Sequence, residues 1–238
     1  MMRTLFIFVF AAICSPLFAQ QTLINDKNAE VRSVTTFSGI RVSGGIDVYL
    51  SQGDSYSLAV SAGEDRFRDR ITTEVKNGIL VISYNNDHFR LSSGNRELRA
   101  YVSFRTIESL EASGASHLII TDKLNANTML IKLSGASRIQ GAVEINDLAL
   151  NLSGASIAKI SGKAQNLNLS ASGASDVKDY DLVTQNCVVD LSGASDVRIV
   201  LNNSIAGSAS GASTLHYEGN PDKKDVVTSG ASSISQRK

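Results

Sequence analysis

Four basic side chains recur at one position of successive repeats in the second half of the chain: Lys159, Lys178, Arg198 and His216. Each stands six residues after the first serine of a Ser-Gly-Ala-Ser tetrapeptide, and Asp176 and Asp196 stand four residues after it. If the tetrapeptides lie in register, these side chains form a basic column beside a short acidic one. A row of cations is suited to an anionic glycan. The same pattern is also typical of a solvated face whose exposed ion pairs contribute little, and a catalytic Asp/Lys/Arg site is a third interpretation.

Other reactive residue types are scattered. His88, His117 and His216 are scattered across different columns, which argues against a metal site. Cys187 shares its position with Met129 and Leu148, and we expect it to be a small buried hydrophobe. The sequence therefore predicts no catalytic residue, no metal site and no cofactor.

Serines and tyrosines are also better explained by structure than by catalysis. The repeated serines are equivalent to one another, and no Gly-x-Ser-x-Gly elbow surrounds any of them. No Gly-Gly-x-Gly-x-Asp calcium repeat is present. An aromatic patch in the first half is conceivable, but core packing is the favoured account of its tyrosines, Tyr49, Tyr56, Tyr84 and Tyr101.

The repeated tetrapeptide Ser-Gly-Ala-Ser indicates which structural elements would position these side chains. It occurs seven times, at intervals of 21, 19, 19, 20, 18 and 19 residues. A period near twenty is that of one turn of a stacked solenoid. The copies begin at Ser113, Ser134, Ser153, Ser172, Ser192, Ser210 and Ser229.

Apolar and polar residues alternate on both sides of each tetrapeptide, which indicates strands with one buried face. Leu148, Leu150 and Leu152 precede the third copy, and Ala158 and Ile160 follow it. The alternation shifts phase at the tetrapeptide, as expected at a corner where glycine bends the chain. We expect each alanine to fill a tight interior position, and the serines to bond to one another or to corner backbone groups. The intervening outward positions are mostly polar or small: Glu111, Lys132, Asn151, Ser170 and Asp190.

This pattern predicts an all-β fold, a parallel β-helix of about 19–20 residues per coil over residues 106–238. Residues 20–105 do not repeat the Ser-Gly-Ala-Ser motif at a regular interval. Ser43-Gly44-Gly45 resembles a degenerate copy of the motif, and we call it the worn corner. Asn77-Gly78 predicts a hairpin, and residues 64–70 are consistent with one helical turn. We expect a small antiparallel β region here that caps the open end of the solenoid.

The first nineteen residues resemble a secretory signal peptide. Arg3 is followed by the apolar run 5–13 and by a cleavage-like end at Ala19. Cys14 lies in this segment, so Cys187 would remain alone and no intramolecular disulfide is expected. Lys and Arg total 23 and Asp and Glu total 23, a balance that argues against nucleic-acid binding. No later segment is long and apolar enough to predict a transmembrane helix.

The segment Phe37-Ser38-Gly39-Ile40-Arg41-Val42-Ser43-Gly44-Gly45-Ile46-Asp47-Val48, together with the repeated corners, resembles the family of autotransporter-adhesin head GIN domains. The resemblance covers residues 35–235. It implies a single-stranded, right-handed parallel β-helix with an N-terminal β region, in exported proteins of Bacteroidetes-type bacteria. The resemblance implies no catalytic residues in this sequence. The sequence also shows no autotransporter barrel of its own.

The function expected from these observations is an exported, non-enzymatic β-helix protein with a structural or adhesin-like surface role. Two alternatives remain open: a carbohydrate-active enzyme of the polysaccharide-lyase type, and a periplasmic factor in envelope assembly or signalling. A glycan, another envelope protein or a second copy of the chain would be the partner. The expected location is the periplasm or the cell surface at the outer membrane.

Overall fold

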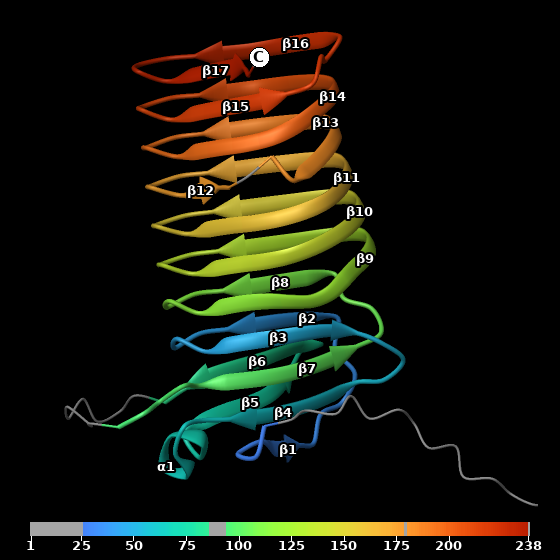
Figure 1. Ribbon diagram of the computed structural model, residues 1–238, viewed down its shortest axis with the longest axis vertical. Helices are drawn as coiled ribbons and strands as arrows, with labels where there is room; N and C mark the ends of the chain where they lie inside the picture. The colour runs from blue at the N-terminus through green and yellow to red at the C-terminus, as the bar shows by residue number, and fades with distance from the viewer. Residues whose placement is uncertain (1–25, 86–93, 179, 238) are drawn as a thin grey trace, which may run out of the picture.

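The computed structural model of the protein describes residues 26–85, 94–178 and 180–237. The predicted signal peptide, with Cys14, and His88 lie outside the described residues. The described chain forms one tall stack of strands with a single short helix near its N-terminal end (Figure 1). Its elements are β1 (Glu30–Arg32), β2 (Gly39–Val42), β3 (Asp47–Gln52), β4 (Ser57–Ser61), α1 (Asp65–Arg68), β5 (Ile71–Lys76), β6 (Ile79–Tyr84), β7 (Arg99–Phe104), β8 (Ser109–Ala112), β9 (His117–Leu133), β10 (Arg138–Leu152), β11 (Ile157–Ala171), β12 (Asp176–Val177), β13 (Leu182–Leu191), β14 (Asp196–Ala209), β15 (Thr214–Glu218), β16 (Lys223–Thr228) and β17 (Ser233–Gln236).

The repeats form a right-handed parallel β-helix, as predicted. In each coil a strand runs to the Ser-Gly-Ala-Ser corner in one sheet, and the next strand returns in a second sheet. Neighbouring coils pair in parallel with equivalent residues opposite, so that Leu150 lies between Ile131 and Leu169. Strands β9, β10, β11 and β14 are long because they run round the far bend from one sheet to the other (Figure 1).

The corners stack directly on one another. In the third corner Gly154 has a φ of +73°, and the amide of Ala155 donates a 2.7 Å hydrogen bond to the carbonyl of Gly135 in the coil below. The last serine, Ser156, is buried, and its hydroxyl donates a 2.7 Å bond to the carbonyl of Ser153. This bond satisfies the buried hydroxyl within its own turn.

The predicted interior position of the motif alanines is wrong. The glycine and alanine form the exposed tip of each corner, and the final serine is the residue that faces inward. The physical reason is the tight turn at the glycine. This turn places the glycine and the alanine of the motif on the solvent side of the corner. The serine then enters the first inward position of the next strand, where a small side chain with a nearby carbonyl partner fits.

The aliphatic columns fill the space between the two sheets. Leu148, Leu150, Leu152, Ala158 and Ile160 are all at most 3% exposed, which confirms their predicted inward positions. Adjacent coils therefore bury a continuous core rather than separate ones.

Cys187 lies in this core, opposite Leu167 and Ile205 of the neighbouring coils, as predicted. Burial raises the pKa of its thiol to about 12, so the reactive thiolate is scarce at pH 8. We expect iodoacetamide to leave Cys187 unmodified in the folded protein and to alkylate it in denaturant. Mass spectrometry of the peptide that contains it measures this, and rapid native labelling would contradict the burial.

The parallel stack continues below the seven repeats. Strands β2 and β3 form a coil around the worn corner, and β6 with β7 form another beneath it. The coil formed by β2 and β3 lies between β6 and β7 on one side and β8 and β9 on the other, so coil order departs from chain order. The solenoid thus begins well before residue 106, where the motif count placed it, because parallel pairing does not require an intact Ser-Gly-Ala-Ser corner.

Antiparallel strands close the N-terminal end. Strand β4 pairs antiparallel with β7 and β1, and β5 pairs antiparallel with β6 through the Asn77-Gly78 turn. Both turn residues have positive φ, as the sequence predicted for this hairpin. The predicted helical turn is α1, which buries Phe67. Within the described residues, β4 and β5 thus cover the outer edges of β7 and β6 at this end.

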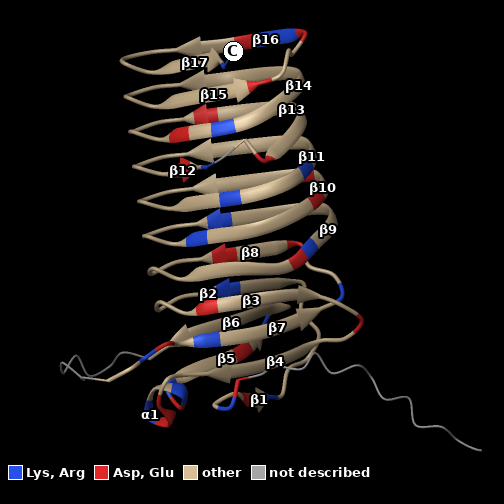
Figure 2. Cartoon of the chain, in the orientation of Figure 1, with Lys and Arg blue, Asp and Glu red and all other residues tan. Residues whose placement is uncertain are grey.

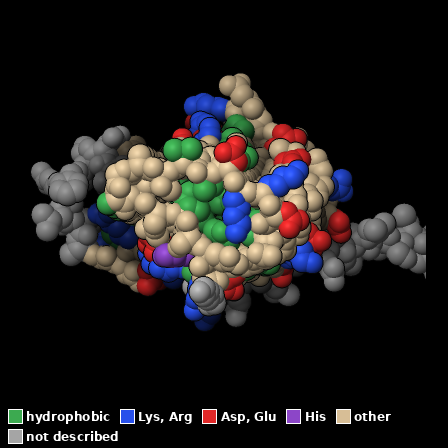
Figure 3. Space-filling view, turned by 90° about the horizontal axis from the view of Figure 1, so that it is seen from above, with side chains coloured by type: hydrophobic (Ala, Val, Ile, Leu, Met, Phe, Trp, Pro, Cys, Tyr) green, Lys and Arg blue, Asp and Glu red, His purple; other side chains and the backbone are tan. Residues whose placement is uncertain are grey.

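The C-terminal end of the solenoid differs from the N-terminal end in how its outermost coil is covered. Among the described residues nothing covers the last coil, and Figure 3 shows apolar side chains at the centre of this end. Lys224 stands opposite Ile205, in a column that is apolar in the coils below, and its ammonium lies 5.7 Å from the Tyr217 ring centroid. An inward-directed charge on a terminal strand disfavours the addition of a further strand. None of the described helices is long and apolar enough to cross a membrane.

Candidate functional site

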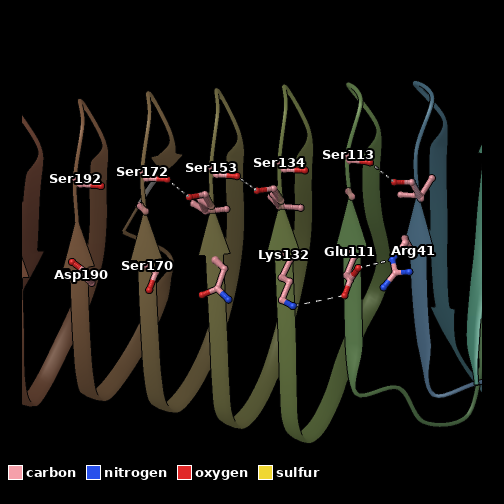
Figure 4. Close-up of a pocket in the computed structure, with 16 residues that line it drawn as sticks. Arg41, Glu111, Ser113, Lys132, Ser134, Ser153, Ser170, Ser172, Asp190 and Ser192 are labelled. Carbon is pink, nitrogen blue, oxygen red and sulfur yellow. Dashed lines mark hydrogen bonds and ion pairs between the residues drawn. The ribbon is translucent and has the colours of Figure 1, made fainter. Parts of the chain in front are cut away.

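A shallow trough runs along the outer face of the sheet that precedes the corners. Its volume is about 520 Å³, and it crosses several successive coils (Figure 4). One wall is the column of first motif serines, from Ser113 to Ser192. The other wall is the outward column two residues earlier, made of Arg41, Glu111, Lys132, Asn151, Ser170 and Asp190.

The serine wall is fixed by the corners. The Ser153 hydroxyl donates to the Leu133 carbonyl of the coil below at 3.4 Å, and Ser172 donates to Leu152 at the same distance. Each hydroxyl keeps its oxygen lone pairs as acceptors. Parallel pairing repeats these groups at about 4.8 Å, so the trough offers a regular row of hydroxyls.

Charge in the second wall is balanced. Arg41 Nε lies 2.6 Å from Glu111 Oε2, and Lys132 Nζ lies 3.9 Å from Glu111 Oε1. The hydrogen bond that Arg41 donates to Glu111 raises the pKa of Arg41, which therefore stays charged. With Asp190 at the far end, the trough holds two cations and two carboxylates. Its middle, at Asn151 and Ser170, carries amide and hydroxyl groups only.

The basic column lies on the other sheet, formed by the strands that follow the corners. Arg198 stands opposite His216 on the next coil, and Asp176 stands opposite Asp196. Lys159 pairs in register with Gln140 of the coil below. Figure 2 shows Lys and Arg in blue and Asp and Glu in red on successive coils of this sheet.

Members of the column contact other polar side chains of the protein. Lys178 Nζ lies 3.5 Å from Asp176 Oδ2, and Arg198 donates a 2.5 Å hydrogen bond to Asp196. His216 Nδ1 lies 2.9 Å from the Ser235 hydroxyl. These contacts match the solvated-face interpretation of the column, and its role in binding an anionic glycan stays a prediction.

The remaining candidate residues are separated from one another. His117 Nδ1 lies 3.5 Å from Asp47 Oδ1, in a different column from His216. In the described part of the chain, no three His, Cys, Asp or Glu side chains are grouped so that they could hold a metal ion.

The tyrosines do not form one patch. Tyr84 is 9% exposed, and Tyr56 packs edge-on against Phe37. Tyr49 and Tyr101 stack with their ring centroids 5.1 Å apart on the outer face of the sheet that follows the corners. The Tyr101 hydroxyl donates a 2.8 Å bond to Asp26, and burial, followed by this bond, raises the pKa of Tyr101 to about 12.

Sequence reasoning placed the trough residues on an outward face without recognising a site. The residue type in their column differs from coil to coil, so the column forms no sequence motif. The available signal was positional: a polar column directly beside a column of hydroxyls.

The chain matches the sequence model of the family described as "Putative auto-transporter adhesin, head GIN domain" over residues 36–221. No curated protein matches it.

Several solved structures share the fold, including three from Bacteroides and Parabacteroides. A putative adhesin from Bacteroides fragilis is 21% identical with a TM-score of 0.77, and the alignment covers 89% of this chain and 98% of that one. A putative adhesin from Parabacteroides merdae is 15% identical with a TM-score of 0.63, covering 88% and 95%. A putative lipid binding protein from Parabacteroides distasonis is 17% identical with a TM-score of 0.62, covering 90% and 98%. At these identities the likeness shows the fold.

Proposed function

Because the chain belongs to the family of auto-transporter adhesin head GIN domains, we propose that it is an exported, non-enzymatic attachment protein. It binds an extended, uncharged polysaccharide along the serine trough, defined above by its two polar columns. The family name supports an adhesin-like role and a location outside the cytoplasm. The sequence resemblance of residues 1–19 to a signal peptide supports the same location.

The observation that carries the proposal is the shape and chemistry of the trough. It is open and continuous over several coils, and it repeats hydrogen-bonding groups at the strand spacing. A linear polymer can meet such a row with successive sugar hydroxyls, whereas a small molecule would use only one coil. The balanced charge favours an uncharged chain, because an acidic one would meet Glu111 and Asp190 without a surplus of cations.

The same geometry opposes a hydrolytic role for the trough. Glu111 and Asp190 are four coils apart, a separation of about 19 Å at about 4.8 Å per coil. Glycoside hydrolysis uses two carboxyl groups about 5–9.5 Å apart. Glu111 is also engaged by Arg41. Neither the family nor the structural neighbours favour the polysaccharide-lyase alternative.

Filling the trough tests the proposal. Ser170 lies midway along it with an outward side chain, so Ser170→Trp should occlude it without entering the core. We expect affinity electrophoresis in gels that contain dextran, xylan or galactomannan to show retention of the parent protein by at least one polymer. The variant should bind at least ~10-fold more weakly, equivalent to about 1.4 kcal/mol.

A double variant on the other sheet, Lys178→Glu with Arg198→Glu, is the matched control. It should leave retention by the neutral polymer unchanged. The same variant tests the basic column, because it should lose retention in polygalacturonate gels if that column binds acidic glycans. Equal retention of Ser170→Trp and the parent would show that the trough is not the binding site.

A further inference from the structure

The longest repeat contains a local irregularity in one of its strands. The step from Ser113 to Ser134 is 21 residues, the longest of the six. Its excess lies in β9, where Ile119 pairs with Gln140 but the next pair is Lys123 with Ala142. Four residues of one strand therefore span two of its neighbour, which is a bulge at Thr121 and Asp122. Bulges redirect side chains and are frequent beside binding sites.

This bulge is held in place from both sides. The Thr121 hydroxyl donates a 3.0 Å bond to the Leu50 carbonyl of the coil below. Beyond the bulge, the Gln52 side chain accepts from the Asn125 amide at 2.8 Å and donates to the Asn125 carbonyl at 3.0 Å. The side chain of Gln52 thus replaces backbone pairing that the bulge interrupts. Thr121 and Asp122 project as a fixed ridge, and both are exposed.

A pocket of about 280 Å³ lies beside this ridge. Its aromatic wall is the stacked pair Tyr49 and Tyr101. Its polar side chains are Ser51, Ser57, Ser103, Thr121 and Asp122. The Ser103 hydroxyl donates to the Ser55 carbonyl at 3.0 Å, which leaves its lone pairs to accept. No cation of the described chain lies within ion-pairing distance of Asp122.

We propose that this pocket, the tyrosine pocket, binds a single neutral pyranose ring. The apolar C–H face of a pyranose packs against an aromatic side chain, while its hydroxyls bond to carboxylate and hydroxyl groups around the rim. A mostly apolar wall with a few placed polar groups is the usual composition of a small-molecule site. The Asp122 carboxylate repels an acidic sugar, which disfavours an anionic ligand.

The tyrosine pocket lies on the sheet that follows the corners, whereas the serine trough lies on the other sheet. The proposal therefore goes beyond the trough and stands on separate residues. Loss of one site leaves the other intact, and the two sites are tested with different ligands.

Saturation-transfer NMR with the methyl glycosides of glucose, galactose, mannose and N-acetylglucosamine tests the pocket. We expect at least one of them to receive saturation from the protein. Deletion of Thr121 and Asp122 shortens this coil to 19 residues, a length that other repeats already adopt. The deletion removes one side of the pocket, so the signal should fall at least ~10-fold while cooperative unfolding is kept.

Point variants separate the contribution of the ring from that of the ridge. Tyr49→Ala should abolish the signal, Tyr49→Phe should retain it, and Ser170→Trp in the trough should leave it unchanged. The proposal is overturned if none of the four glycosides receives saturation. It is equally overturned if both the deletion and Tyr49→Ala bind as the parent does, whatever the trough does with polysaccharide.

Discussion

Leu150→Asp is expected to abolish cooperative folding of the repeat stack. Leu150 is fully buried at mid-stack, between Ile131 and Leu169 of the adjacent coils. Removing a buried leucine side chain costs about 2–5 kcal/mol, and an unpaired carboxylate in its place adds a desolvation penalty of several kcal/mol. The sum is comparable to the whole stability of a typical domain, about 5–15 kcal/mol.

Thermal unfolding followed by circular dichroism measures this effect. The matched control is Asn151→Asp, which places the same carboxylate one residue along β10, on the outward face at the trough. The control should unfold within a few degrees of the parent. A cooperative transition for Leu150→Asp at the parent temperature would contradict the assignment of this column to the interior.

Gly154→Ala is the second change with a large expected effect, although it adds only a methyl group at an exposed corner. At a φ of +73° an alanine carries about 1–2 kcal/mol of strain. The added Cβ would also lie 2.5 Å from the Gly135 carbonyl oxygen, which already accepts the Ala155 amide. One backbone must shift, so we expect a total loss of about 2–4 kcal/mol in unfolding free energy.

Gly45→Ala in the worn corner isolates the strain from the clash. Gly45 has nearly the same φ, +74°, but the nearest atom to an added Cβ is the Gly114 carbonyl oxygen at 3.9 Å. The equivalent residue of the next coil is already an alanine, Ala115, at a φ of +66°. Urea unfolding should show only the strain, a loss of about 1–2 kcal/mol, for Gly45→Ala. Equal losses for the two variants would mean that corner stacking contributes nothing.

The repeat region could be predicted closely because each physical constraint recurs in every coil. Alternation assigned Leu150 and Ala158 to the interior, and glycine marked the corners. Alternation could not predict whether the motif alanines face the interior or the solvent. Alanine and serine are both small, and only the turn geometry brings the Ser156 hydroxyl to the Ser153 carbonyl.

The N-terminal coils were harder for a different reason. Alternation shows that a segment is a strand, but it does not show which strand it pairs with or in which direction. Strand β2 pairs in parallel with β6 and β8, which lie far along the chain, and the worn corner carries no repeated motif. The trough and the tyrosine pocket were missed because both join residues from several coils. In hindsight, the 21-residue interval was the sequence signal for the ridge.

The placement of residues 39–52 between two later segments bears on how the chain acquires its structure. During synthesis or export from the N terminus, this segment emerges before both of its neighbours. It gains them only once the chain is available as far as residue 120, where β9 has paired with β3. Residues 39–52 must therefore remain without their neighbouring strands until then. Each later repeat can pair with the preceding coil as soon as it is synthesised or exported.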